Sequence, residues 1–243
     1  MKELMPEEIL RYERQLLVWD KKIQGKLKNS NIFIAGAGGL GSSASIYLAG
    51  AGVGKISICD FDKVEITNLN RQILHNDLRI GKNKAESAKK TLERTNKNVE
   101  VIALSEKIDE NNVSDLIGEV NVIVDCLDNF ETRFVLNKYA VKKKIPLVFG
   151  AVQGFEGQIS FIKHPETFCL ACLFEEIPPK EIFPAVGVTP GVIGTLQALE
   201  VLKYLTKIGE NLNNELLIWD GLTNDFRKVT IKKDPACEIC GKL

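Results

Sequence analysis

The residues best suited to chemistry begin with a glycine-rich segment, Gly36 to Gly41, which reads Gly-Ala-Gly-Gly-Leu-Gly. Glycines let a backbone turn tightly and approach phosphate oxygens, which then meet the free N–H groups and positive dipole end of the next helix. Asp60 follows about 20 residues later, where a carboxylate accepts a hydrogen bond from a ribose hydroxyl. The segment predicts a nucleotide site, although close helix–strand packing alone also uses such glycines. It does not choose among NAD, FAD and ATP.

Polar residues further along favour ATP. Asn68 and Arg71 follow the second expected strand, and Lys84 lies at the start of the next expected helix. Asp128 follows the fourth expected strand, at the carboxyl edge where open α/β sheets bind ligands. Two cations could neutralise a triphosphate, and a carboxylate could hold Mg²⁺ together with phosphate oxygens. We therefore expect ATP and Mg²⁺, with a nicotinamide-dependent oxidoreductase as the alternative.

Two Cys-x-x-Cys pairs, Cys169/Cys172 and Cys237/Cys240, supply four thiolates, a closed tetrahedral set for Zn²⁺. A zinc ion there would tie the C-terminal tail to the body of the protein. The alternative is a redox pair, which is less suited to two pairs in a reducing compartment. The other cysteines and both histidines have no motif around them, and we expect ordinary buried or polar residues: Cys59, Cys126, His75 and His164.

The elements that must position these residues alternate in type. Pro6 and the acids after it predict an N-terminal helix over residues 6–27. Apolar runs predict strands and amphipathic runs predict helices, and this alternation is typical of a doubly wound sheet. The expected strands are residues 31–35, 55–60, 99–104, 121–125 and 146–149, and the expected helices are 40–51, 82–95 and 128–144.

The pattern changes after Gly150. We expect a strand of antiparallel type at 157–163, a polar stretch with prolines at 175–190, a helix at 192–206, and strands at 216–219 and 226–231. With no repeat and no long linker, we predict one α/β domain over residues 1–243 with a Rossmann-like mixed sheet. Its parts are an N-terminal helical segment, 1–30, a nucleotide-binding half, 31–150, and a zinc-clipped half with antiparallel strands, 151–243.

The composition excludes some partners. Lysine plus arginine equals aspartate plus glutamate, at 32 each, which argues against bulk attraction to nucleic acid or an anionic membrane. The charged start lacks the apolar core of a secretory signal, and no window reaches the roughly 18 apolar residues of a membrane span. We expect a cytoplasmic protein.

Several further motifs accompany these residues. They are Arg11-Tyr12-x-Arg14-Gln15, Asp60-Phe61-Asp62, Asn68-x-x-Arg71-Gln72, Asp128-Asn129 with Arg133, Glu156-Gly157-Gln158, and Gly191 to Ala198. Together with the glycine loop, Lys84 and the cysteine pairs, they cover nearly the whole chain. The combination resembles the MoeB/ThiF/HesA family, which is similar to the catalytic core of ubiquitin-activating enzymes.

The resemblance implies adenylation of the C-terminal glycine carboxylate of a small ubiquitin-like sulfur carrier such as MoaD or ThiS, with release of pyrophosphate. The pathway would be molybdopterin, thiamine or thiolated-tRNA synthesis, with a separate sulfur donor. A variant is adenylation of a peptide C-terminus. A non-catalytic scaffold is a third class, against which the set of Asn68, Arg71, Lys84 and Asp128 argues.

The resemblance also implies roles for single residues. Arg71 and Lys84 would neutralise charge, and Asp128 would take Mg²⁺. The spacing itself predicts that Arg133, one helical turn beyond Asn129, orders the Asp128 loop through an ion pair. Arg14 would reach the triphosphate of a neighbouring subunit, which implies a homodimer, whereas spacing alone makes Arg14 part of a solvated helix face. The implied nucleotide-binding set is Gly36, Gly38, Gly39, Gly41, Asp60, Asp62, Asn68, Arg71, Lys84, Asp128 and Asn129.

The sequence departs from the family in one loop. Many relatives carry a cysteine before the Gly-Val-x-x-Pro segment, where it can form a thioester or persulfide. Residues 175–187 contain no cysteine here, and Phe183 stands at about the matching position. We therefore expect no thioester at position 183. Adenylation needs no protein nucleophile, so the main hypothesis is unaffected.

Overall fold

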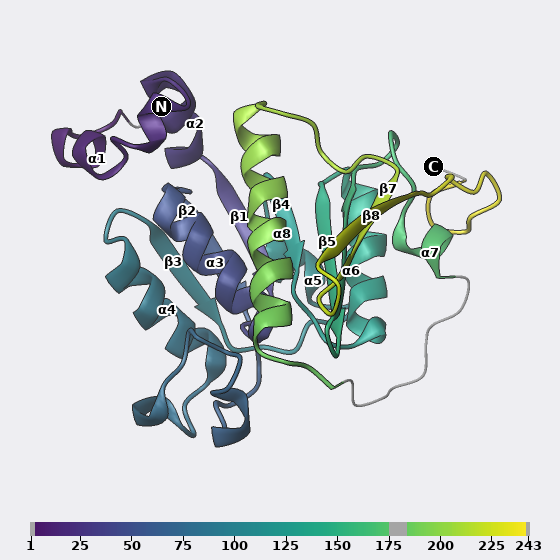
Figure 1. Ribbon diagram of the computed structural model, residues 1–243, viewed down its shortest axis with the longest axis horizontal. Coiled ribbons are helices and arrows are strands. Elements are labelled where there is room, and N and C mark those ends of the chain that lie inside the picture. The colour runs from purple at the N-terminus through teal and green to yellow at the C-terminus, as the bar shows by residue number, and fades with distance from the viewer. Residues whose placement is uncertain (1–2, 175–183, 242–243) are drawn as a thin grey trace.

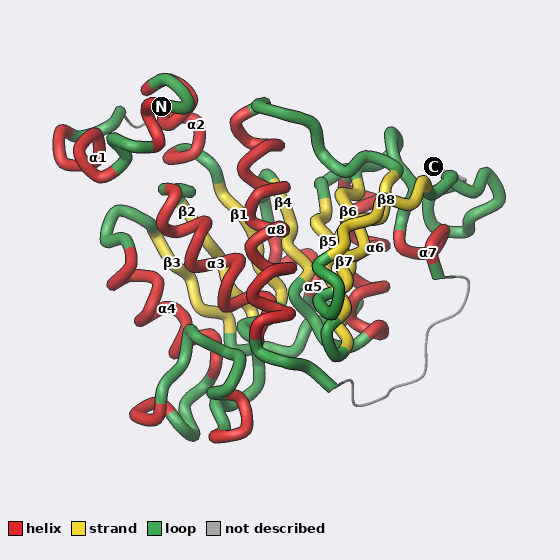
Figure 2. Tube along the Cα trace, viewed as in Figure 1, coloured by secondary structure: helices red, strands yellow, loops and turns green. Residues whose placement is uncertain are grey.

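A computed structural model describes residues 3–174 and 184–241. The described residues form one eight-stranded sheet in the order β3-β2-β1-β4-β5-β6-β7-β8 (Figures 1 and 2). The strands are β1 (Asn31–Ala35), β2 (Lys55–Cys59), β3 (Glu100–Leu104), β4 (Val122–Asp125), β5 (Leu147–Gln153), β6 (Glu156–Ile162), β7 (Glu215–Asp220) and β8 (Asp225–Thr230).

The sheet is mixed, as the sequence predicts. Strands β1 to β5 pair in parallel, and β6 to β8 continue the sheet in antiparallel pairs. The chain runs outward from β1 through β2 to β3 and then returns to place β4 on the other side of β1. This reversal creates a crevice at the carboxyl ends of β1 and β4, where doubly wound folds bind ligands. The predicted doubly wound mixed sheet is confirmed.

Helices cover both faces of the sheet (Figure 1). Ile32 and Ile34 of β1 pack toward one face, and Phe33 and Ala35 toward the other, as the two-residue repeat of a strand requires. The first face carries α3 (Gly39–Ala51), α4 (Lys84–Thr95) and α8 (Val188–Thr206); the second carries α5 (Val113–Ile117), α6 (Phe130–Lys143) and α7 (Leu170–Leu173).

The N-terminal segment differs from the prediction. The expected single helix is divided into α1 (Pro6–Arg11), a 3-10 turn at Gln15–Leu17 and α2 (Lys21–Lys28). Asp20 begins the second helix, because its side chain accepts a hydrogen bond from the Ile23 N–H. The Gln15 and Trp19 side chains both donate to Gln24 Oε1. These tertiary bonds fold the segment back on itself, so the prediction of one helix was wrong.

Other differences are smaller. Helix α8 begins at Val188 rather than at 192, because a proline fits the first turn of a helix and Pro190 lies there. Strand β5 extends to Gln153, where it forms a tight hairpin with Glu156 of β6. The short helices α5 and α7 were not predicted. Among the described helices, none is long and apolar enough to cross a membrane.

Candidate nucleotide-binding site

A cavity of about 620 Å³ opens at the carboxyl edge of β1, β2 and β4. Its walls come from the glycine loop, the segments after these strands, and the β5–β6 hairpin. The cavity brings together most of the predicted site residues: Gly36, Gly38, Gly39, Asp60, Asp62, Arg71, Lys84, Asp128 and Asn129.

The glycines have different physical roles. Gly36 has a φ of +100°, and a Cβ there would lie 2.6 Å from the Cys126 carbonyl oxygen. A Cβ on Gly41 would lie 2.0 Å from the Gly36 carbonyl oxygen, so Gly41 serves packing and does not line the cavity. At Gly38 a Cβ would meet only the Gln72 side chain, at 3.7 Å. No described side chain caps the start of α3, so its first N–H groups can meet an anion.

Asp60 connects the end of β2 to the glycine loop. Its Oδ2 accepts a hydrogen bond from the Ala37 N–H at 2.8 Å, and its Oδ1 accepts one from the Asp62 N–H at 2.9 Å. Burial raises the pKa of Asp60, while these N–H groups and the Lys84 charge oppose the rise. A carboxylate oxygen has two lone pairs, so Asp60 can still accept a ribose hydroxyl.

Lys84 lies beside the glycine loop in an ion pair with Asp62. It begins α4, where the Asn83 side chain accepts a hydrogen bond from the Glu86 N–H. Its Nζ lies 3.0 Å from Asp62 Oδ2, and only 10% of the lysine side chain is exposed, against 51% for the aspartate. The exposed carboxylate is the partner that can move when a phosphate competes for the lysine.

The Asn68–Arg71 segment presents one of its two predicted side chains. Arg71 lines the cavity, and its Nη1 donates to the Thr67 carbonyl oxygen at 2.9 Å. Asn68 does not line the cavity; its buried Oδ1 accepts a hydrogen bond from the Glu65 N–H at 3.0 Å. Asn68 thus shapes the turn that carries Arg71. Arg14 is exposed and does not line this cavity.

The loop that carries Asp128 is clamped from behind. The Leu127 N–H donates to Asp125 Oδ1 at 3.1 Å, and Arg133 Nη2 donates to the Leu127 carbonyl oxygen. Arg133 is buried, with its Nε 3.9 Å from Asp125 Oδ1 and its guanidinium stacked on Phe149. Burial raises the pKa of Asp125, and the Arg133 charge opposes the rise. These are the contacts expected of a residue that orders the loop.

The unassigned cysteines and His75 are buried, as expected from the sequence. Cys59 and Cys126 line the cavity; burial raises the pKa of Cys59 to about 12 and that of Cys126 well above its ordinary value. Both thiols are therefore protonated at neutral pH. His75 connects the glycine loop to α4, with Nε2 2.9 Å from the Ala37 carbonyl oxygen and Nδ1 2.9 Å from Ser87 Oγ.

Several residues that line the cavity were not predicted from the sequence. Gln72 is buried, and its Oε1 has no hydrogen-bond partner among the described residues, which makes it available to a ligand. Glu106 and Lys107 follow β3 at the same carboxyl edge, so the edge rule could have found them. Gln153, Glu156 and Gln158 come from the antiparallel hairpin, to which that rule does not apply.

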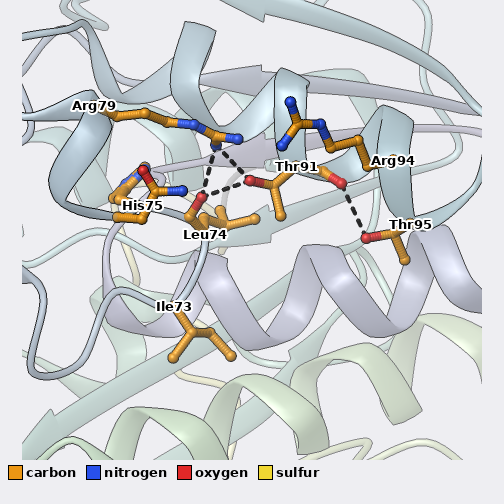
Figure 3. A pocket seen from close by; sticks show the side chains of 8 residues that line it. Ile73, Leu74, His75, Arg79, Thr91, Arg94 and Thr95 are labelled. Carbon is orange, nitrogen blue, oxygen red and sulfur yellow. Dashed lines mark hydrogen bonds between the residues drawn. The ribbon is translucent and has the colours of Figure 1, made fainter.

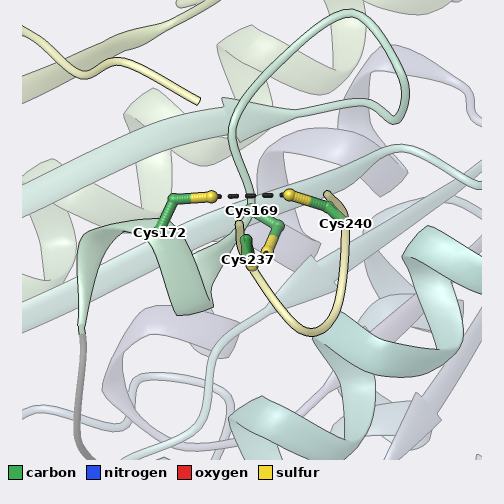
Figure 4. A group of neighbouring side chains, drawn as sticks. All are labelled: Cys169, Cys172, Cys237 and Cys240. Carbon is green, nitrogen blue, oxygen red and sulfur yellow. Dashed lines mark hydrogen bonds between the residues drawn. The ribbon is translucent and has the colours of Figure 1, made fainter. Parts of the chain in front are cut away.

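The four paired cysteines lie together on the face of the sheet that carries α6 and α7 (Figure 4). All their Sγ atoms are within 4.8 Å of one another, with Cys169–Cys237 at 3.7 Å and Cys172–Cys240 at 3.4 Å. Tetrahedral zinc with Zn–S bonds of about 2.3 Å requires sulfurs about 3.8 Å apart. The residues present therefore fit a structural zinc ion.

Comparisons with known proteins agree with this geometry. The ThiF family model matches residues 12–239. The chain is 38% identical to the sulfur carrier protein adenylyltransferase of Thermus thermophilus, over 97% of this chain and 92% of the relative. It is also 38% identical to the molybdopterin-synthase adenylyltransferase of Escherichia coli (strain K12), over the full length of both.

Among solved structures, E. coli MccB with ATP superposes with a TM-score of 0.84 at 26% identity, covering 95% of this chain and 74% of MccB. The microcin C7 biosynthetic enzyme MccB in complex with N-formylated MccA superposes with a TM-score of 0.88 at 25% identity, covering 95% and 75%. The family match over most of the chain and the full-length relatives establish that this chain belongs to the ThiF family, the MoeB/ThiF family that its motifs resemble.

Proposed function

We propose that this chain adenylates the C-terminal glycine carboxylate of a small ubiquitin-like sulfur-carrier protein, using ATP and releasing pyrophosphate. The observation that carries the proposal is one cavity that combines a free helix start, the cations Arg71 and Lys84, and the Asp128 carboxylate. That carboxylate, Asp128, has no hydrogen bond or ion pair within the described part of the chain. The names of the full-length relatives support the same activity.

The chemistry needs charge neutralisation and alignment more than bond-making side chains. A carrier carboxylate oxygen attacks the α-phosphorus of ATP, and the bond to the bridging oxygen breaks as pyrophosphate leaves with the electron pair. Arg71 and Lys84 offset the charge on the phosphates, and the helix start at Gly39 adds its N–H groups. Asp60 orients the ribose. Mg²⁺, when bound with ATP, would neutralise phosphate oxygens beside Asp128, with Asn129 next to it.

No protein nucleophile takes part in this proposal. The cavity thiols of Cys59 and Cys126 are protonated, because burial raises their pKa values. Residues 175–183 of the cysteine-free loop, Phe183 included, lie outside the described residues, and the absence of a thioester there stays a prediction. Intact-protein mass spectrometry after incubation with carrier and ATP tests it, and a thiol-sensitive adduct mapped to this loop would contradict it.

The remaining roles also belong to this proposal. Residues 151–243 would receive the carrier, since the β5–β6 hairpin forms one wall of the cavity. Arg14 is exposed and does not line its own cavity, which fits a role at the triphosphate of a neighbouring copy in a homodimer. A separate protein would supply sulfur, and the reaction would take place in the cytoplasm without a direct nucleic-acid or membrane partner.

The zinc half has a structural role. Cys169, Cys172, Cys237 and Cys240 would hold Zn²⁺ with a closed set of four thiolates, which leaves no position for a substrate. The ion would fix the C-terminal tail beside α6, where the Leu170 N–H donates to Asn137 Oδ1 at 3.0 Å.

Pyrophosphate exchange tests the function directly. The purified chain is mixed with ATP, Mg²⁺, labelled pyrophosphate and one of several candidate carriers that end in Gly-Gly. We expect label to enter ATP only when the cognate carrier is present. Turnover of NADH without any exchange would instead support the nicotinamide alternative, and wild-type exchange in Arg71→Ala would contradict the assigned site.

The MccB structures favour a second candidate, adenylation of a peptide C-terminus. The same assay separates the two when free C-terminal peptides are compared with whole folded carriers. Exchange supported equally by a short peptide and by the whole carrier would favour the peptide reading. Exchange that requires the folded carrier would favour the sulfur-carrier reading.

A further inference from the structure

A second pocket, of about 460 Å³, lies behind the segments that supply Arg71 and Lys84 to the nucleotide cavity. One wall is the stretch from Ile73 to Arg79, and the other is the last two turns of α4, with Thr91, Arg94 and Thr95 (Figure 3). Figure 3 shows the guanidinium groups of Arg79 and Arg94 on either side of Thr91, and the Arg94 charge acts on Arg79. The pocket therefore places two cations together.

Among the described residues, these two arginines have no counter-ion. Within residues 3–174 and 184–241, neither forms an ion pair with a carboxylate, and no acidic residue lines the pocket. Arg79 is 9% exposed, and both its burial and the Arg94 charge lower its pKa. An unpaired buried charge is costly, and a second positive charge beside it adds to the cost.

Neighbouring groups satisfy only part of Arg79. Its Nη1 donates to the Leu74 carbonyl oxygen at 3.1 Å, the Ser87 carbonyl oxygen at 2.5 Å and Thr91 Oγ1 at 2.5 Å. Its Nε and Nη2 have no partner among the described residues, and neither has the Arg94 side chain. A guanidinium presents its donors in a planar fork that matches carboxylate and phosphate oxygens.

The C-terminal end of α4 explains only some of this charge. Carbonyl groups at a helix end attract cations, and Arg11 uses this by donating to the Thr95 carbonyl oxygen at 3.2 Å. That attraction suits Arg94, which is exposed. It does not account for burying Arg79 beside a like charge, which an external anion would offset.

We propose that the pocket between Arg79 and Arg94 binds an oxyanion, a phosphate or a carboxylate. Two sources fit this chemistry. One is free phosphate, and the other is an acidic side chain of a second copy of this chain, because Ile73 and Leu78, next to the pocket, are 63% and 92% exposed. None of the residues that line this pocket lines the nucleotide cavity, so the proposal does not rest on the adenylation reaction.

Titration calorimetry tests the free-anion source. Inorganic phosphate is titrated into the full chain saturated with Mg²⁺ and a non-hydrolysable ATP analogue, so that the nucleotide cavity is filled. We expect saturable binding at one site per chain, weakened at least tenfold by Arg94→Gln. The matched control is Lys90→Gln, which removes an exposed charge from the same helix outside the pocket and should change affinity less than twofold.

Sedimentation equilibrium of the same proteins without phosphate tests the second source. If a carboxylate of a second copy occupies the pocket, Arg94→Gln raises the dimer dissociation constant at least tenfold and Lys90→Gln does not. Arg94→Lys, which retains the charge, should recover most of either effect. The proposal is overturned if Arg94→Gln changes neither phosphate affinity nor self-association, or if phosphate binds equally to all the variants.

Discussion

The nucleotide cavity and the cysteine cluster differ in how their polar groups are satisfied. In the cavity, Asp60 and Lys84 already have protein partners, while Gln72 Oε1 and the Asp128 carboxylate have none among the described residues. In the cluster, the four sulfurs lie within 4.8 Å of one another. The cavity is thus assembled without its ligand, whereas the cluster needs a metal to hold four thiolates close together.

This difference separates two kinds of defect. The cavity residues lie at strand ends that the sheet already fixes, so losing one should impair the reaction and leave folding intact. The cysteines come from two short segments, far apart in the chain, that a bound metal would cross-link, so losing one should impair stability. A substitution in the cavity is therefore expected to lower activity more than stability, and a substitution in the cysteine cluster to lower stability more than activity.

The largest expected effect is on stability, from Cys240→Ser. The variant should lose bound zinc and with it a cross-link across the 68 residues that separate Cys169 from Cys237. Closing such a loop is worth about 4 kcal/mol by the chain-entropy relation. Chemical denaturation and metal analysis of the two proteins measure both changes.

A chelator provides the control for this prediction. Dialysis against it should destabilise the wild-type chain by a similar amount and should leave Cys240→Ser unchanged. At a temperature where the variant remains folded, its pyrophosphate exchange should stay near the wild-type rate. Equal stability and equal zinc content in the two proteins would show that the cluster is not a metal clip.

Asp128→Asn should produce the reverse pattern. Removing one group that stabilises developing charge in an active site costs about 10²–10³-fold in rate. We expect a loss of that size in carrier-dependent exchange, with a thermal midpoint close to that of the wild type. Asp115→Asn, which changes an exposed aspartate on α5 in the same way, should have little effect on either quantity. Exchange within twofold of wild type in Asp128→Asn would remove this residue from the site.

How much of this could be predicted from the sequence depends on whether the signal is local. The positions of the strands along the chain and the glycine loop follow from periodicity and spacing. The doubly wound mixed sheet and the cysteine cluster were predicted from such patterns. The direction of a side chain is not local. Asn68 faces its own turn and Arg71 faces the cavity, although the two stand three residues apart.

Long-range contacts also account for the other differences. The N-terminal helix is broken because Gln15 and Trp19 bond to Gln24, which periodicity does not encode. The pocket at Arg79 and Arg94 depends on two segments that the fold places side by side. No motif marks either arginine in the sequence.

Substitutions at two glycines of α3, Gly41 and Gly50, test whether the glycine loop must keep its shape. Gly41→Ala places a Cβ 2.0 Å from the Gly36 carbonyl oxygen, so the loop must shift, and overpacking of this kind costs about 1–3 kcal/mol. Gly50→Ala, in the same helix, meets nothing within 4 Å and should stabilise the protein by about 0.5–1 kcal/mol. Denaturation curves measure both changes, and the Michaelis constant for ATP should rise only in Gly41→Ala. If both substitutions changed the free energy of unfolding in the same direction, this interpretation of the loop would be contradicted.

The smallest expected effect concerns pH and His75, which supports the cavity loop from behind. Burial lowers its pKa from 6.5 to about 4, and the positive charges of Lys84 and Arg79 add to the lowering, while the hydrogen bond to the Ala37 carbonyl oxygen opposes it. Between pH 6.5 and 4, the His75 ring is therefore protonated in the unfolded chain and neutral in the folded chain. The contribution to stability is full above pH 6.5 and is lost as the pH falls, by about 1 kcal/mol between pH 6.5 and 5.5.

His75→Gln isolates this term, because other titrating groups are the same in both proteins. Asp60 and Asp125, whose pKa values are raised by burial, act in the opposite direction and cancel in the comparison. The difference in unfolding free energy between wild type and variant should shrink as the pH is lowered through this window. A difference that stays constant with pH would mean that the folded protein tolerates a charged imidazole behind the glycine loop, and that this loop is not held by the neutral ring.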